Sequence, residues 1–157
     1  MASGTGRTFG LKPVVPTEPI YRLSVDQYHA LIEYGKLLED DSIELLEGWL
    51  VPKMPKNPPH RLSTRRVRGK LEALIPPGWY VDSQEPITTL ESEPEPDDVV
   101  VRGHPDDYAN RHPGPHDLGL IVEVADASLK RDRTLKKRIY ARANIPHSPQ
   151  RNKCSLS

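Results

Sequence analysis

An apolar run with one acidic residue in its middle constrains the fold of this chain more than any other stretch. Residues 118–125, LGLIVEVA, are too few to cross a membrane and are rich in β-branched residues. Such a run predicts a strand buried on both faces, inside a sheet that helices cover. Glu123 interrupts the run, and a carboxylate in an apolar strand is costly unless a metal ion or another cation pairs with it.

A helix predicted over residues 128–143 contains a second charge in an apolar setting. At about 100° per residue its apolar side chains share one face, and Lys136 falls near the middle of that face. Most other basic residues of this helix lie toward its flanks or its far side. Taken alone, Glu123 and Lys136 indicate a buried salt bridge, or a lysine whose stem lies along apolar surface.

The composition indicates one domain with a moderate core. The 157 residues contain 22 basic and 22 acidic side chains, so any basic surface must be local. Cys154 is the single cysteine, which excludes an intramolecular disulfide and fits a reducing compartment. No apolar segment has the length of a membrane span, and the first residues lack the pattern of a signal peptide. We therefore expect a cytoplasmic protein without a membrane partner.

The periodic segments predict an α/β (α+β) domain over residues 20–146, preceded by a flexible segment over residues 1–19. Helices are expected near residues 25–35, 59–75 and 128–143. Besides the apolar run, the expected strands are two that turn at Glu47-Gly48, one from Trp79 towards Leu90, and one over residues 97–102. The turn at residues 47–48 is expected to expose the Glu47 side chain.

The helix predicted over residues 59–75 carries the strongest basic patch of the chain. It is expected to bury Leu71 and Leu74 among other apolar residues. Five cations within ten residues are expected on its exposed side: Arg61, Arg65, Arg66, Arg68 and Lys70. A solvated helix face is the simpler explanation, and contact of Arg61, Arg65 and Arg68 with a phosphate backbone is the functional one. His60 either belongs to the helix cap or faces a functional site.

Four polar residues lie where apolar or inward-facing positions are expected: Glu44, Asp97, Glu123 and Lys136. Carboxylates that converge from a sheet provide oxygen ligands for a hard cation such as Mg²⁺ or Mn²⁺. Such an ion lowers the pKa of bound water, and a nearby lysine stabilises charge on a phosphodiester transition state. No phosphate-binding loop, dinucleotide-binding motif or nucleophile elbow competes with this interpretation. The four residues therefore indicate hydrolysis of phosphodiester bonds.

The same residues carry a resemblance to a known nuclease family. In the second half of the chain they are Pro96-Asp97, Glu123-Val124, Lys136 and Tyr140-Ala141-Arg142-Ala143. Upstream, the segments IELLEG at 43–48, MPKNPPH at 54–60 and QEPI at 84–87 extend the pattern. Together they resemble the restriction endonucleases of the Uma-two family, which belongs to the PD-(D/E)XK nuclease superfamily. The resemblance covers about residues 21–146.

The resemblance implies a restriction-endonuclease-like mixed β-sheet flanked by helices, and a Mg²⁺-dependent endonuclease that acts on DNA. It makes Asp97 and Glu123 the metal-binding acids and Glu44 an additional ligand. His60 matches a recurring histidine without an assigned role. Restriction-type nucleases often act as dimers, so a homodimer is the implied assembly.

The position of the catalytic lysine distinguishes this family within the superfamily. In the superfamily's plain pattern the lysine lies two residues after the second acid, where this chain has Ala125. The Uma-two pattern places a lysine on the following helix instead. Lys136 matches that position, in agreement with the helical periodicity.

After Pro146 the chain departs from the family's pattern. Residues 147–157, HSPQRNKCSLS, are polar and lack strand alternation, whereas the family continues into an aromatic, apolar strand. We therefore expect a divergent polar tail over residues 147–157 and an unpaired sheet edge. This departure favours the alternative of a catalytically inactive, nuclease-like interaction module. The proposed catalytic residues all precede it.

Overall fold

The computed structural model describes residues 17–53, 55–124 and 130–150. Most of the segment predicted to be flexible (residues 1–16), Ala125 and the last part of the polar tail (residues 151–157) lie outside the described residues.

Helices and strands alternate along the described chain. In order they are α1 (Val25–Glu33), the 3₁₀ helix η1 (Glu39–Asp41), β1 (Ile43–Leu46), β2 (Trp49–Pro52), α2 (Pro58–Leu74), β3 (Trp79–Asp82), β4 (Asp98–Arg102), the 3₁₀ helices η2 (Pro105–Tyr108) and η3 (Pro115–Asp117), β5 (Leu118–Val124), α3 (Lys130–Arg142) and β6 (His147–Gln150). The three predicted helices and the predicted hairpin are confirmed, with ends shifted by a few residues.

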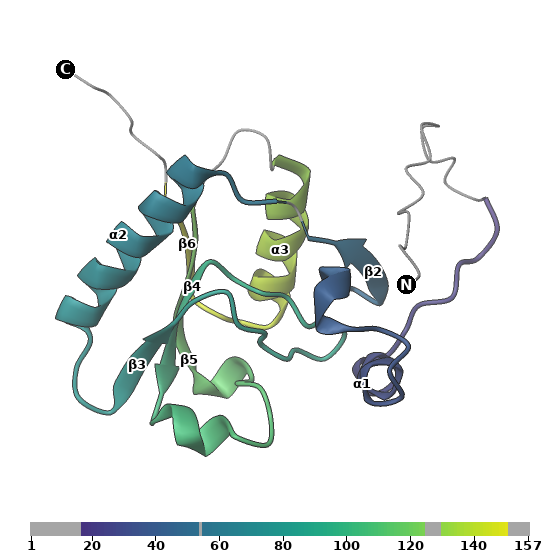
Figure 1. The fold of residues 1–157 in the computed structure, drawn as a ribbon, viewed down its shortest axis with the longest axis horizontal. Coiled ribbons are helices and arrows are strands. Elements are labelled where there is room, and N and C mark those ends of the chain that lie inside the picture. The colour runs from purple at the N-terminus through teal and green to yellow at the C-terminus, as the bar shows by residue number, and fades with distance from the viewer. Residues whose placement is uncertain (1–16, 54, 125–129, 151–157) are drawn as a thin grey trace, which may run out of the picture.

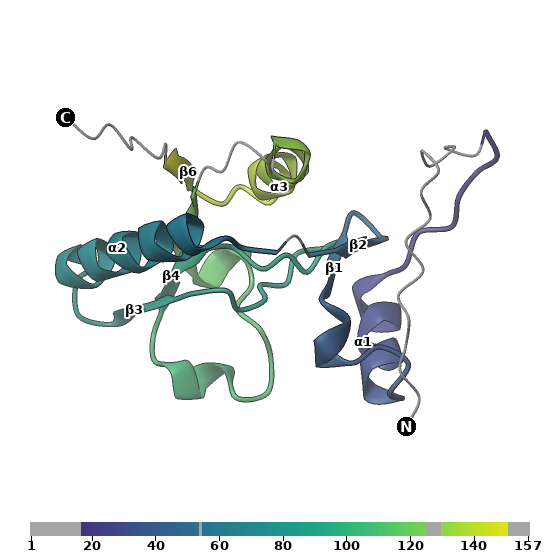
Figure 2. The same ribbon diagram turned by 45° about the horizontal axis from the view of Figure 1, so that its top comes forward.

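The centre of the fold is a four-stranded mixed sheet in the order β3-β4-β5-β6. Neighbours in the first three strands are antiparallel, and β6 is parallel to β5. Helices α2 and α3 lie on opposite sides of this sheet (Figure 1). The separate β1-β2 hairpin and α1 lie at one end of the molecule (Figure 2). The predicted fold class, a mixed sheet flanked by helices, is confirmed.

The hydrophobic core contacts one face of the sheet. Val99 of β4 and Ile121 of β5 pack with Tyr140 of α3, and all three are almost completely buried. Side chains alternate between the two faces of a strand. Asp97 and Glu123 have the same parity as these core residues, so both belong to the face that α3 covers.

The connection between β3 and β4 crosses the molecule to reach the hairpin. The strand expected to run from Trp79 towards Leu90 ends at Asp82, because Gln84 has a left-handed φ of 59° and the prolines that follow cannot donate to a ladder. The Glu93 N–H donates to the Leu45 carbonyl of β1 at 2.7 Å. Residues 93–97 therefore lie between the hairpin and β4.

The turn of the hairpin holds α3 in place. Glu47 was expected to be exposed, but it is 7% exposed and accepts hydrogen bonds from Arg138 at 2.7 and 2.6 Å and from Arg142 at 3.1 Å. The Arg138 hydrogen bond holds the pKa of Glu47 below its ordinary value, although burial opposes it. Because these bonds fix α3 against β1, they also set the position of Lys136 relative to Glu44.

Helix α2 buries a different stripe from the one expected. Leu74 is 80% exposed. The side chains that face the protein follow a spacing of three or four residues: His60, Thr64, Val67, Leu71 and Ile75. This stripe passes beside Leu74, and its two most buried members are polar.

The polar residues after Pro146 form a strand, contrary to expectation. β6 pairs with β5 so that His147 lies opposite Ile121 and Ser148 opposite Val122. Strand pairing uses backbone N–H and C=O groups, and those of the buried strand β5 need hydrogen-bond partners. Polar side chains on β6 therefore do not prevent the pairing. The expectation of a strandless tail is therefore wrong for residues 147–150. The domain boundaries remain predictions.

Candidate active site

Two carboxylates lie side by side at one end of the β4-β5 pair. Asp98 is paired with Val122, so continuing the register by one position places Asp97 opposite Glu123. Opposed residues in an antiparallel pair have Cβ atoms about 4.5–5.5 Å apart. The Val124 N–H donates to Asp97 Oδ2 at 2.8 Å, in agreement with this placement.

A buried ion pair joins the hairpin to α3 beside these carboxylates. Lys136 Nζ lies 3.0 Å from Glu44 Oε1, and both residues are almost fully buried. Lys136 Nζ also donates to the Glu95 carbonyl at 3.1 Å, while the Glu95 N–H donates to Glu44 Oε2 at 2.9 Å. The inward position predicted for Lys136 is confirmed. The backbone of Glu95 is hydrogen-bonded to both members of the ion pair.

Asp97 has two further partners on the side of α2. His60 Nε2 lies 2.9 Å and Lys56 Nζ 3.0 Å from Asp97 Oδ1. Although burial raises the pKa of Asp97, the Lys56 ammonium and the His60 hydrogen bond outweigh it and lower the pKa. Asp97 is therefore an ionised, hydrogen-bonded carboxylate inside the protein.

Glu123 is a carboxylate that its neighbours compensate only in part. Burial raises the pKa of Glu123 to about 7, with further increases from the charges of Asp97 and Glu44, while the Lys136 ammonium opposes the change. The Tyr140 hydroxyl donates to Glu123 Oε1 at 2.6 Å. A cation near Glu123 would relieve the repulsion among these acids.

The donor atoms suit a hard divalent cation that has few protein ligands. Asp97 and Glu123 offer adjacent carboxylate oxygens, which Mg²⁺ and Mn²⁺ prefer. Within the described residues, no group of three or more His, Cys, Asp or Glu side chains is placed to hold a metal ion. Glu44 pairs with Lys136, and its role as an additional ligand remains a prediction. Two carboxylates are enough for Mg²⁺, because water and substrate phosphate oxygens fill its other positions.

The basic residues of α2 form an exposed stripe next to this site. Arg61, Arg65 and Arg68 are exposed and follow one another at helical spacing, directly beside the buried stripe that begins with His60. Arg68 pairs with Glu72 at 2.8 Å, four residues further along the helix. The predicted stripe is therefore present, but its arginines do not contact the carboxylates.

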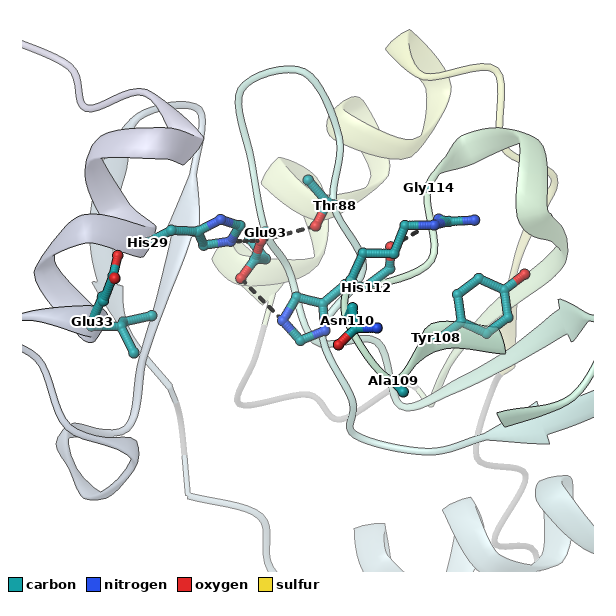
Figure 3. Close-up of a pocket in the computed structure, with 11 residues that line it drawn as sticks. His29, Glu33, Thr88, Glu93, Tyr108, Ala109, Asn110, His112 and Gly114 are labelled. Atoms are coloured by element: carbon teal, nitrogen blue, oxygen red, sulfur yellow. Dashed lines mark hydrogen bonds and ion pairs between the residues drawn. The ribbon is translucent and has the colours of Figure 1, made fainter. Parts of the chain in front are cut away.

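A pocket of about 820 Å³ lies elsewhere, between α1 and the loop that follows η2. Figure 3 shows its central interaction, in which His29 and His112 approach the Glu93 carboxylate from two sides. The distances to Glu93 are 2.6 Å from His29 Nε2 and 3.7 Å from His112 Nε2. None of the predicted catalytic residues lines this pocket, so we attach the candidate site to the carboxylates and not to the pocket.

Comparison with known proteins connects this geometry to a family. Residues 25–148 match the model of the Uma2 family, which is described as "Putative restriction endonuclease". The chain belongs to this family. The Uma2 match includes Glu44, Asp97, Glu123 and Lys136, and it confirms the resemblance found in the sequence. No curated protein matches the chain.

A solved structure supports the same fold. The chain resembles a "putative nuclease belonging to DUF820" from Anabaena variabilis, with a TM-score of 0.63 and 13% sequence identity over 82% of this chain and 74% of that chain. At this identity the likeness concerns the fold, which is restriction-endonuclease-like. In the described part of this Uma2 chain, no helix is long and apolar enough to cross a membrane.

The sequence did not reveal the roles of three contributors to the site. Lys56 belongs to the MPKNPPH segment of the family pattern, but a lysine in a proline-rich loop has no periodic context that assigns it to the site. Tyr140 belongs to the family pattern, but helical periodicity does not reveal the partner of its hydroxyl. The Glu95 contribution comes from its backbone. The position of the Glu95 backbone depends on how the segment 93–97 crosses from the hairpin to β4.

The ion pair of Glu44 and Lys136 predicts strongly coupled stability effects. Glu44→Gln or Lys136→Met leaves one buried charge without its partner and should lower the free energy of unfolding by about 3–5 kcal/mol. The double variant should cost clearly less than the sum of the two changes. Urea unfolding at neutral pH measures all four members of this cycle, and additive changes would contradict the pairing.

Proposed function

We propose that this Uma2 protein is a divalent-metal-dependent endonuclease that hydrolyses phosphodiester bonds in DNA. The observation that carries the proposal is the pair Asp97 and Glu123, a buried and a partly buried carboxylate brought together by strand register, with Lys136 on the helix that covers them. A purely structural cluster of ion pairs would not need an acid whose charge is left without full compensation. Here burial and acidic neighbours raise the pKa of Glu123, as expected for an acid that binds a cation.

Each residue has a defined role in this proposal. Asp97 and Glu123 hold Mg²⁺ or Mn²⁺, and Glu44 orients Lys136 and adds negative charge beside the ion. A divalent ion held there supplies positive charge at the scissile phosphate and lowers the pKa of water. Lys136 orients the attacking water or stabilises charge that develops on the phosphate. His60 holds Asp97 in position through its hydrogen bond.

DNA is the proposed partner, with a homodimer as the proposed assembly. The exposed arginines of α2 are suited to contact phosphates of a DNA bound at the site. The first turn of this helix places His60 against Asp97, and the arginines continue from that turn along the surface. The overall charge of the chain is balanced, so this local stripe supplies the positive surface.

The alternative is a nuclease-like module that binds a partner and does not cleave. The lysines support it, since Lys56 and Lys136 already neutralise Asp97 and Glu44. The presence of β6 weakens it, because residues 147–150 pair with β5 after all. A folded sample that binds no Mn²⁺ and cuts no DNA would favour this alternative.

Plasmid cleavage tests the proposed activity. The protein should nick or cut supercoiled DNA with MgCl₂ or MnCl₂, and EDTA should stop it. Asp97→Asn, Glu123→Gln and Lys136→Met should each reduce the rate by about a hundredfold or more, because they remove charges needed near the phosphate. Lys137→Met is the matched control, since it removes an exposed lysine from the same helix. Metal-dependent cleavage that persists undiminished in the three variants would show that the site is misassigned.

The salt dependence of DNA binding tests the role of α2. Fluorescence anisotropy with a labelled duplex in EDTA gives the slope of log affinity against log salt concentration. Arg65→Gln should reduce the magnitude of this slope by about 1, because one phosphate contact is lost. Lys36→Gln, an exposed lysine just after α1 at the other end of the molecule, should leave it unchanged. Equal slopes for all three proteins would remove the arginine stripe from the interface.

A further inference from the structure

Lys56 differs from Lys136 in how it is held at the site. Lys136 is enclosed in the protein, where it binds the Glu44 carboxylate and the Glu95 carbonyl. The Lys56 side chain is 27% exposed, comes from the loop before α2, and lies 3.0 Å from a single carboxylate, that of Asp97. One lysine is built into the core, and the other reaches the same cluster of charges from the surface.

The charges of the site make Lys56 the cation that compensates Asp97. A buried carboxylate is costly without a positive partner. His60 and the Val124 amide supply hydrogen bonds, and the Lys56 ammonium, 3.0 Å from Asp97, supplies a full positive charge. It therefore does for Asp97 what Lys136 does for Glu44.

A divalent ion held by Asp97 and Glu123 would change this balance. The ion would take over the compensation of Asp97, and it would stand close to the Lys56 ammonium, which it repels. The carboxylate has about four acceptor positions, of which Lys56, His60 and the Val124 amide use three. The Lys56 side chain is partly exposed, so its ammonium can move into solvent, whereas the enclosed Lys136 has no comparable route.

We propose that Lys56 is an exchangeable counter-ion of the metal site, which neutralises Asp97 while no divalent ion is bound and is released when the ion binds. This inference rests on the proposed function, because it takes Asp97 as a metal ligand. The released ammonium belongs to the loop just before α2, the helix that carries the arginine stripe. There it adds a cation for the phosphate backbone of DNA. Metal binding thus exposes part of the DNA-binding charge.

Mn²⁺ affinity provides the first test, measured by isothermal titration calorimetry on the full chain at pH 7.5 without DNA. Lys56→Met removes the competing charge and should bind Mn²⁺ about tenfold more tightly than the unaltered protein. Lys53→Met is the matched control. It removes an equally charged, partly exposed lysine from the same loop, but Lys53 pairs with Glu95 and not with Asp97. It should change the affinity by less than about threefold.

The second measurement requires no variant. Lys56 of the unaltered protein should react slowly with an amine-selective acetylating reagent without metal, and several-fold faster with saturating MnCl₂. Peptide mass spectrometry reads the modification of Lys56, with Lys137 as an exposed reference in the same sample. This result remains decisive if Lys56→Met does not fold.

The outcomes separate this inference from the proposed function. If the unaltered protein binds Mn²⁺ and Asp97→Asn does not, the metal site stands. Equal affinities of Lys56→Met and Lys53→Met, or a Lys56 reactivity that Mn²⁺ leaves unchanged, would then overturn the counter-ion role alone. No Mn²⁺ binding by the folded, unaltered protein would overturn both.

Discussion

The antiparallel pairing of β4 with β5 places Asp97 and Glu123 side by side on a buried face, and the surrounding structure follows from the need to compensate them. Like charges at this separation repel each other, and burial removes the water that would screen them. Within the described chain, compensation comes from several elements: Lys136 from α3, Lys56 from the loop before α2, His60 from the first turn of α2, and the Tyr140 hydroxyl. The raised pKa of Glu123 shows that this compensation is incomplete.

The same interactions connect the parts of the fold that lie furthest apart in sequence. The hairpin contributes Glu44 to the pair with Lys136, and its turn holds α3 through Glu47 and Arg138. The segment 93–97, between the hairpin and β4, binds both members of the Glu44–Lys136 pair through the backbone of Glu95. Site geometry and tertiary structure therefore depend on each other. A change at the hairpin turn is expected to disturb the position of Lys136 without touching it.

The sequence predicted the parts of the site that appear as charges in apolar patterns. Glu44, Glu123 and Lys136 stood out because strand and helix periodicity assigns their positions to the interior, and Asp97 stood out as the acid that begins a buried strand. Lys56 could not be found in this way, because a lysine in a loop has no periodic context. The strand β6 was missed for a related reason: its pairing uses backbone groups, which a polar sequence does not reveal. Leu74 was misplaced because the buried stripe of α2 begins with a polar residue, His60.

The central claim is that Asp97 and Glu123 together hold a divalent metal ion. Anomalous diffraction from crystals grown with MnCl₂ tests it most directly, since the signal locates manganese without reference to activity. The account predicts one strong peak about 2 Å from a carboxylate oxygen of each residue. A bound manganese located elsewhere, for example beside Glu93 between His29 and His112, or no peak in a crystal that diffracts well, would contradict it.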